Sequence, residues 1–169
     1  LYTLHSVKDE LNDDVVILFS DVLLSLKLLK DCIESSQDYC LIVDKKNISN
    51  TTMFVSIENE KIFDIGSHIS LEKADGNFIG IAKYSRHGAK LLARQIEDLV
   101  KKGDHKLEYY TSALIGISNK GEEIRYIEVA ENLKWTEIDL KEEYEKALVH
   151  GISIFEDEET SKWTEIDLK

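Results

Sequence analysis

The sequence predicts a layered α/β fold with a mixed sheet. Apolar runs typical of buried strands alternate with helical patterns along the chain, and one pair of strands reads as a hairpin inserted into that alternation. The chain has 169 residues, of which 43% are hydrophobic, enough for one core of ordinary size. We therefore expect a single domain over residues 1–151.

The first half of the chain predicts two buried strands separated by a helix. Residues 13–19 (DDVVILF) form a β-branched apolar run bounded by acids, which predicts a central, parallel strand buried on both faces. A helix should follow over 20–35, entered through Ser20 or Asp21 as its capping residue. Residues 38–46 (DYCLIVDKK) predict the second buried strand.

The second half predicts a hairpin and then alternating strands and helices. The turn letters ENEK divide 51–69 into the two strands of the hairpin. The remaining elements follow from apolar periodicity and glycine stops: a strand over 77–85, a helix over 86–103, a helix over 109–121, a strand over 123–130 and a short helix over 142–151.

Charge and composition exclude several classes of function. The net charge of −12 argues against partners held by phosphate contacts, so we expect neither nucleic acid nor an anionic membrane surface as a partner. No apolar run reaches the ~18–20 residues that span a bilayer. Cys32 and Cys40 have neither the spacing of a zinc site nor that of a disulfide framework. We expect a cytoplasmic protein, and a homo-oligomer stays open.

The octapeptide KWTEIDLK occurs at 134–141 and again at 162–169. A helical pattern follows the first copy, whereas the second ends the sequence after an acidic run. We interpret the first copy as the functional segment and 152–169 as an acidic tail that carries a duplicate.

Two aspartates lie where predicted strands end. Asp21 follows the first strand, and Asp139 stands between the strand of the first octapeptide and the next helix. Open α/β sheets bind ligands at such positions, and two carboxylates meeting there could hold Mg²⁺ together with substrate phosphates. The alternative is that each aspartate only caps the helix behind it.

Four segments resemble a known family. VVILFSDVLL, LIVDKK, ADGNFIGIAKYSRHGAKLL and KWTEIDLKEEYEKAL lie in the order expected of sugar-phosphate-type nucleotidyltransferases. They look most like the branch associated with phosphoenolpyruvate phosphomutase, which makes cytidylyl-phosphonates, with phosphocholine cytidylyltransferases as close relatives. The resemblance implies a Rossmann-like, three-layer sandwich with a mostly parallel sheet, and transfer of a cytidylyl group from CTP to 2-aminoethylphosphonate. Phosphocholine or a sugar 1-phosphate is the alternative acceptor.

The resemblance also implies roles for single residues. Asp21 and Asp139 match the two aspartates that bind Mg²⁺ in that family. Substrate contacts are implied for the strand and the octapeptide that face the acceptor, at Gly76, Phe78, Gly80, Lys83, Trp135 and Glu137. The alternatives are a tightly packed strand for the glycines, a solvated lysine, and a core tryptophan.

One part of the family pattern has no counterpart in this sequence. The glycine-rich loop L-x-A-G-x-G-x-R, whose backbone amides grip the triphosphate, is absent from it. The chain therefore resembles the C-terminal two-thirds of such an enzyme, and we expect it to be catalytically silent as it stands. A degenerate, non-catalytic relative and an unrelated small α/β interaction domain remain alternatives.

Overall fold

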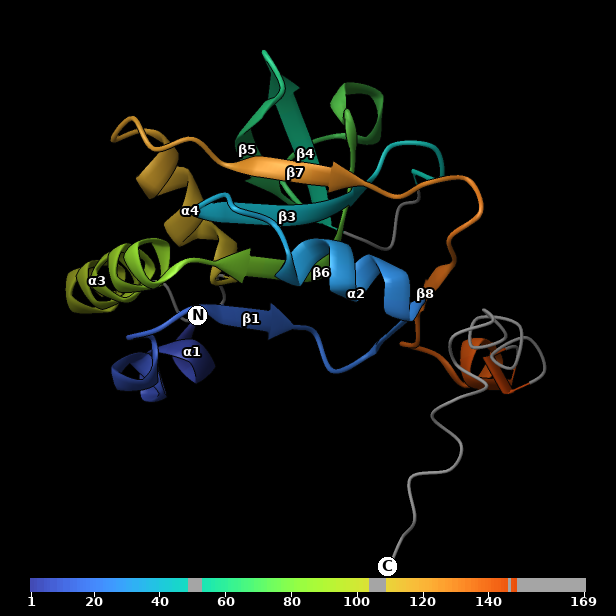
Figure 1. The fold of residues 1–169 in the computed structure, drawn as a ribbon, viewed down its shortest axis with the longest axis horizontal. Coiled ribbons are helices and arrows are strands. Elements are labelled where there is room, and N and C mark those ends of the chain that lie inside the picture. The colour runs from blue at the N-terminus through green and yellow to red at the C-terminus, as the bar shows by residue number, and fades with distance from the viewer. Residues whose placement is uncertain (49–52, 104–108, 146, 149–169) are drawn as a thin grey trace, which may run out of the picture.

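A mixed sheet of six strands forms the centre of the protein (Figure 1). The computed structural model describes residues 1–48, 53–103, 109–145 and 147–148. Five strands follow one another in the order β5-β4-β6-β3-β7. β1 pairs with the same edge of β6 as β4 does, but farther along that strand. The strands are β1 (Val15–Leu18), β3 (Tyr39–Asp44), β4 (Met53–Glu58), β5 (Lys61–Gly66), β6 (Gly76–Tyr84) and β7 (Arg125–Glu128).

The strand directions correct one prediction. Among the described pairings of this sheet, only β3 with β7 is parallel; β1 with β6, β3 with β6, β4 with β6 and β4 with β5 are antiparallel. The mixed α/β sheet is confirmed, but the expectation of a mostly parallel sheet is wrong. Apolar runs such as β3 and β6 indicate burial on both faces, and helices over both faces bury antiparallel strands equally well.

The first strand is an edge strand and not a central one. β1 pairs antiparallel with β6 only, within the described residues, and the side chain of Leu18 is exposed. The predicted central, parallel strand over 13–19 is therefore wrong. Its apolar run reflects packing of Val15 and Ile17 against the core beneath and does not require strands on both sides.

Helices cover both faces of the sheet, which confirms the three layers. Helices α1 (Tyr2–Ser6), α3 (Arg86–Lys102) and α4 (Thr111–Ser118) lie on one face. Helix α2 (Leu26–Ile33) lies on the other. Successive residues of a strand point to opposite faces, so Leu41 and Val43 join the first core while Ile42 joins the second.

A second sheet of two strands stands off the main one. It consists of β2 (Val22–Leu24) and β8 (Trp135–Glu137), paired antiparallel. The predicted helix over 20–35 therefore begins later, at Leu26 after Ser25, and neither Ser20 nor Asp21 caps it. A short apolar run fits a strand as well as a helix, and β8, far away in the sequence, decides between them.

The remaining elements agree with their predictions. Asn59 and Glu60 adopt φ values of 50° and 61° at the hairpin turn, which suits a tight connection between β4 and β5. Helix α3 ends at Gly103 with φ of 73°. Residues 141–145 and 147–148 are helical, whereas 149–151 and the predicted tail 152–169 lie outside the described residues.

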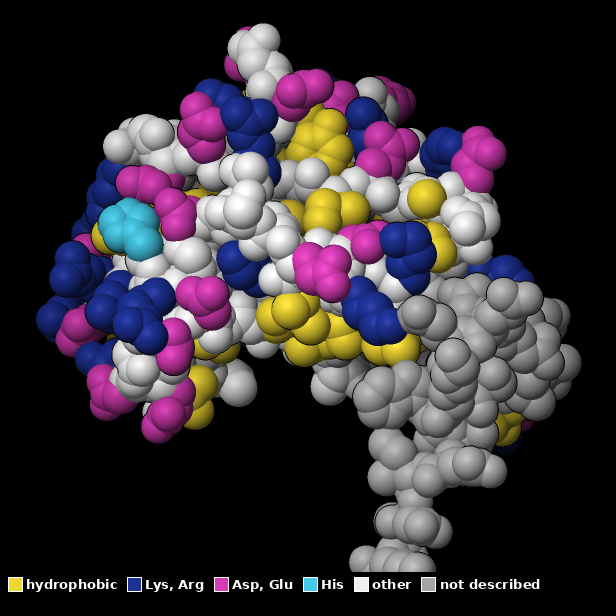
Figure 2. Space-filling model, viewed as in Figure 1, with side chains coloured by type: hydrophobic (Ala, Val, Ile, Leu, Met, Phe, Trp, Pro, Cys, Tyr) yellow, Lys and Arg dark blue, Asp and Glu magenta, His cyan; other side chains and the backbone are white. Residues whose placement is uncertain are grey.

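The surface carries charges of both signs. On the face drawn in Figure 2, basic side chains are interspersed with acidic ones. Several are paired, such as Lys45 with Glu128 and Arg125 with Glu123. Among the described residues, no helix has both the length and the apolar character that crossing a bilayer requires.

Candidate functional site

Three carboxylates converge beside the small sheet. Asp21, Glu137 and Asp139 each offer a carboxylate oxygen, and these oxygens lie within 4.8 Å of one another. Divalent cations hold carboxylate oxygens at about 2.1 Å (Mg²⁺) to 2.6 Å (Ca²⁺), so two ligands across one ion are about 4–5 Å apart. The three side chains thus have the spacing of a cation site.

The pairing of β2 with β8 brings these residues together. Asp21 stands directly before β2, and Glu137 ends β8 opposite Val22. The ladder continues past the strands, because the amide of Ile138 donates to the carbonyl of Asp21 at 2.8 Å. Two segments more than a hundred residues apart in the sequence therefore place their acids at the same end of the small sheet.

The side chain of Asp139, the third acid, does not cap the helix that follows it. The backbone amides of Asp139 and Leu140 both donate to Oε2 of Glu143, at 2.8 and 2.9 Å. Glu143 thus caps the start of the helical segment from 141, and the carboxylate of Asp139 is not used for that purpose. Neither aspartate therefore caps a helix: α2 begins after Ser25, and Glu143 caps the segment that follows Asp139.

The electrostatics of the cluster favour a bound cation. Oδ1 of Asp21 and Oε2 of Glu137 are buried and have no hydrogen-bond partner among the residues that the structure describes. Burial, followed by the negative charges of Asp139 and Asp21, raises the pKa of Glu137 to about 7. Within the described part of the chain, no lysine or arginine pairs with any of the three acids. A divalent cation would satisfy the unpartnered oxygens and offset the repulsion.

The glycines predicted to face substrate lie at points of close packing. A side chain at Gly76 would meet Cγ1 of Val43 at 2.6 Å. Gly80 has φ of +83°, and the ring of Phe19 occupies the place where its side chain would stand. Phe19 lies two residues before Asp21 and its amide donates to the carbonyl of Gly80, so Gly80 fixes the path of the chain into the site.

Phe78 and Lys83 also have structural contacts. Phe78 is buried in the core under α3 and α4, edge-on to Phe19 with ring centroids 5.7 Å apart. The ammonium of Lys83 donates to the carbonyls of Ser35 and Gln37, at 2.8 and 3.2 Å, beyond the end of α2. The roles in substrate binding that the sequence analysis expects of Gly76, Phe78, Gly80 and Lys83 stay predictions.

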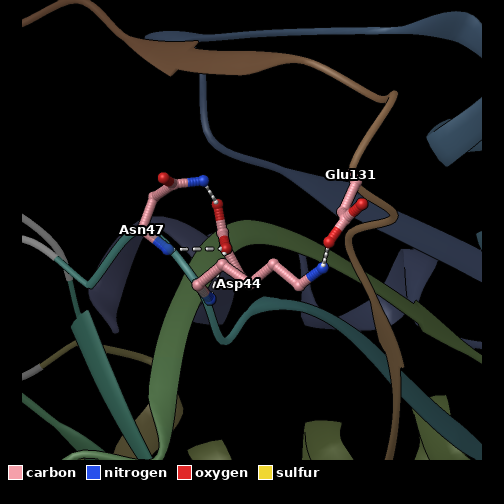
Figure 3. Close-up of polar contacts among 4 residues, drawn as sticks. Asp44, Asn47 and Glu131 are labelled. Atoms are coloured by element: carbon pink, nitrogen blue, oxygen red, sulfur yellow. Dashed lines mark hydrogen bonds and ion pairs between the residues drawn. The ribbon is translucent and has the colours of Figure 1, made fainter.

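Trp135 connects the small sheet to the main one. Its indole N–H donates to Oδ2 of Asp44, the last residue of β3, at 2.8 Å. Oδ2 and Oδ1 of the same carboxylate accept hydrogen bonds from Asn47 (Figure 3). Asp44 is not predicted as a site residue, although an acid that ends a fully buried strand is a signal that could have identified it.

Comparisons with known proteins identify the fold. No protein-family model matches the sequence, and no curated protein matches it. Among solved structures, the inositol-1-phosphate CTP transferase from T. maritima has a TM-score of 0.68 at 17% identity, covering 90% of this chain and 60% of its own. The CTP:phosphocholine cytidylyltransferase from Streptococcus pneumoniae has a TM-score of 0.68 at 18% identity, with coverages of 90% and 62%.

A third structure agrees with these two. A putative glucose-1-phosphate thymidylyltransferase from Bacillus anthracis has a TM-score of 0.69 at 16% identity, covering 95% of this chain and 63% of its own. The chain therefore spans somewhat less than two thirds of the length of each of these structures. At such identities the likeness establishes the architecture. The chain has the α/β fold of these nucleotidyltransferases.

Proposed function

We propose that this chain contributes the cation-binding and acceptor-side part of a Mg²⁺-dependent nucleotidyltransferase. The reaction transfers a cytidylyl group from CTP to a phosphonate or phosphate monoester and releases pyrophosphate. The observation that carries the proposal is the cluster of Asp21, Glu137 and Asp139, with carboxylate oxygens within 4.8 Å of one another, on a fold shared with nucleotidyltransferases.

The cluster suits phosphoryl-type chemistry. An anionic oxygen of the acceptor attacks the α-phosphorus of the triphosphate, the new P–O bond forms, and the bond to pyrophosphate breaks. The attacking oxygen already carries a negative charge, so no side chain is needed to remove a proton. When bound, a divalent cation neutralises charge on the phosphate oxygens, and Asp21, Glu137 and Asp139 would hold it there. The glycine-rich loop that grips the triphosphate in the resembled family has no counterpart in this sequence.

The favoured acceptor is 2-aminoethylphosphonate, which rests on the resemblance of ADGNFIGIAKYS to the phosphonate-associated branch. Two of the similar structures are named for CTP-dependent transfer to other phosphate esters, inositol 1-phosphate and phosphocholine. The shared chemistry is a small phosphorus oxyanion as nucleophile. The amine of 2-aminoethylphosphonate would further suit a surrounding of acidic side chains.

The cation site is tested by Mn²⁺ titration of the full chain, with free Mn²⁺ read from its electron paramagnetic resonance signal. Each of Asp21→Asn and Asp139→Asn should weaken binding at least about tenfold, because each removes a charged ligand. Glu72→Gln is the matched control: it removes one exposed carboxylate charge from another part of the chain and should leave the affinity unchanged. Equal affinity in the wild type and both aspartate variants would overturn the site.

The acceptor is tested by calorimetric titration of the chain in Mg²⁺ with 2-aminoethylphosphonate, phosphocholine and glucose 1-phosphate. The proposal expects the phosphonate to bind most tightly and its binding to weaken in Asp139→Asn. Tighter binding of either phosphate ester would overturn the choice of acceptor and leave the cation site standing. The pyrophosphate-releasing reaction itself is expected only once the triphosphate-binding loop is supplied.

A further inference from the structure

We infer that Asp44 is a positioning residue, which fixes β8 through the indole N–H of Trp135 and so holds Glu137 and Asp139 against Asp21. The inference rests on the proposed cation site and adds to it a residue that does not itself touch the cation. It is carried by the contacts of one buried carboxylate.

Asp44 is only 1% exposed, and its two oxygens accept four hydrogen bonds. Oδ1 accepts from the backbone amides of Lys46 and Asn47, at 2.9 and 3.0 Å. Oδ2 accepts from Nδ2 of Asn47 at 3.0 Å and from Nε1 of Trp135 at 2.8 Å. All four partners are donors, so the site requires an ionised carboxylate and has no place for a donor on residue 44.

These bonds join three parts of the fold at one point. Asp44 ends β3, Asn47 belongs to the loop behind it, and Trp135 begins β8. The loop is bound in turn to the centre of the sheet, because Nδ2 of the buried Asn77 on β6 donates to the carbonyl of Asn47 at 2.7 Å. Asp44 therefore transmits the position of the rigid main sheet to β8.

The small sheet needs such a connection. β8 has three residues and, within the described parts of the chain, pairs only with β2, which also has three. The side chains of Trp135, Val22 and Leu24 pack on the second core, but apolar packing has no preferred direction. Trp135 and Glu137 are two residues apart on one strand, so they point to the same face, and a hydrogen bond that orients the indole also orients the carboxylate beside it.

A second contact joins the same loop to the segment before β8 and supplies a control. Lys46, in the same loop, forms an ion pair with Glu131 in the segment before β8 (Figure 3). Both side chains are largely exposed, at 48% and 82%. Exposed ion pairs fix geometry weakly, so this link should matter little for the site.

The test is the affinity of the full chain for Mn²⁺ in the wild type, Asp44→Asn, Trp135→Phe, the double variant and Lys46→Ala. Asp44→Asn keeps the shape but turns an NH₂ group toward donors, and Trp135→Phe keeps most of the packing but removes the donor. Each should weaken Mn²⁺ binding about tenfold, as is usual for groups that orient a metal ligand. The double variant should be no weaker than the singles, since both remove one bond, and Lys46→Ala should bind as the wild type does.

Urea unfolding with and without saturating Mn²⁺ separates positioning from mere stability. A positioning role shrinks the increase in midpoint that Mn²⁺ produces, because that increase depends on the affinity of the folded state. A purely structural role lowers both midpoints equally and leaves the affinity unchanged, which would overturn the inference. Should Trp135→Phe lack the circular dichroism of a folded chain, Asp44→Asn alone decides.

The outcomes also separate this inference from the proposed function. If the wild type binds Mn²⁺ and loses it in Asp21→Asn, while Asp44→Asn and Trp135→Phe bind unchanged, the cation site stands and the positioning role is overturned. If the wild type does not bind Mn²⁺, or Asp21→Asn binds it equally well, the proposed function falls and the positioning role falls with it.

Discussion

The ring of Phe19 lies against Gly80, so close that a methyl group on Gly80 would stand 2.6 Å from Cδ2 of Phe19. The backbone of Gly80 has φ of +83°, a conformation that side chains disfavour. β6 pairs with β4 up to Phe78 and with β1 from Ile81, so this glycine lies between the two pairings. Two residues beyond Phe19 the chain reaches Asp21, which makes this contact part of the approach to the carboxylate cluster.

Gly80→Ala should therefore lower the free energy of unfolding by about 2–4 kcal/mol, through backbone strain and the displaced ring together. Urea unfolding measures the change. Gly121→Ala is the matched control, because Gly121 has φ of +98° but no atom within 4 Å of the place that a methyl group would take. The control should cost only the backbone strain, about 1–2 kcal/mol. Equal losses in the two variants would show that the Phe19 contact contributes nothing.

Much of this arrangement could be predicted from local pattern. The strand over 77–85 and the helix over 86–103 have strong periodicity and clear ends, and the structure confirms both. Asp21 and Asp139 are expected together because each follows a predicted strand, and the structure does bring them into one cluster, but through the pairing of β2 with β8 in the small sheet. Their metal-binding role stays a prediction.

What could not be predicted depends on partners distant in the sequence. Residues 22–24 form a strand because β8 pairs with them, and no local feature of a short apolar run reveals that partner. The bond between Asp44 and Trp135 spans 91 residues and belongs to no motif. The edge position of β1 likewise follows from the order of strands in the sheet, which the run of residues 15–18 does not encode.

Lys83→Met tests whether this lysine serves the fold. The variant keeps the buried stem but leaves the carbonyls of Ser35 and Gln37 without their donor, so the free energy of unfolding should fall by about 1–3 kcal/mol. Affinity for Mn²⁺ and for 2-aminoethylphosphonate should stay unchanged. Lys73→Met, at an exposed lysine, is the control and should be within about 0.5 kcal/mol of the wild type. Loss of acceptor binding at unchanged stability would instead support the substrate contact predicted from the sequence.

The lowered pKa of Asp44 should make the free energy of unfolding depend on pH in acid. Burial alone raises the pKa of this carboxyl, but the hydrogen bonds from Trp135, Asn47 and Lys46 outweigh it and lower the pKa below the usual 3.8. A carboxyl with a lowered pKa stabilises the fold fully above pH 3.8 and loses that contribution as the pH falls through its folded value. Asp44→Asn should be less stable than the wild type at pH 6, and the difference should shrink below pH 3.8. A difference that stays constant down to pH 2 would contradict this account.

Glu137→Gln should have opposite effects with and without a cation. In the cation-free protein, burial and the charges of Asp139 and Asp21 raise the pKa of Glu137 from 4.5 to about 7. A raised pKa means that the folded state prefers the protonated carboxyl, so this contribution to stability is full below pH 4.5 and is lost as the pH rises through about 7. At pH 8, with chelator present, Glu137→Gln should therefore unfold at a higher urea concentration than the wild type, since glutamine carries no charge to repel its neighbours. With saturating Mn²⁺ the order should reverse, because the variant has lost a cation ligand.

Glu72→Gln, which removes a carboxylate in another part of the chain, should shift neither midpoint. A Glu137→Gln variant that is less stable than the wild type in chelator at pH 8 would show that the three acids do not repel one another in the folded protein.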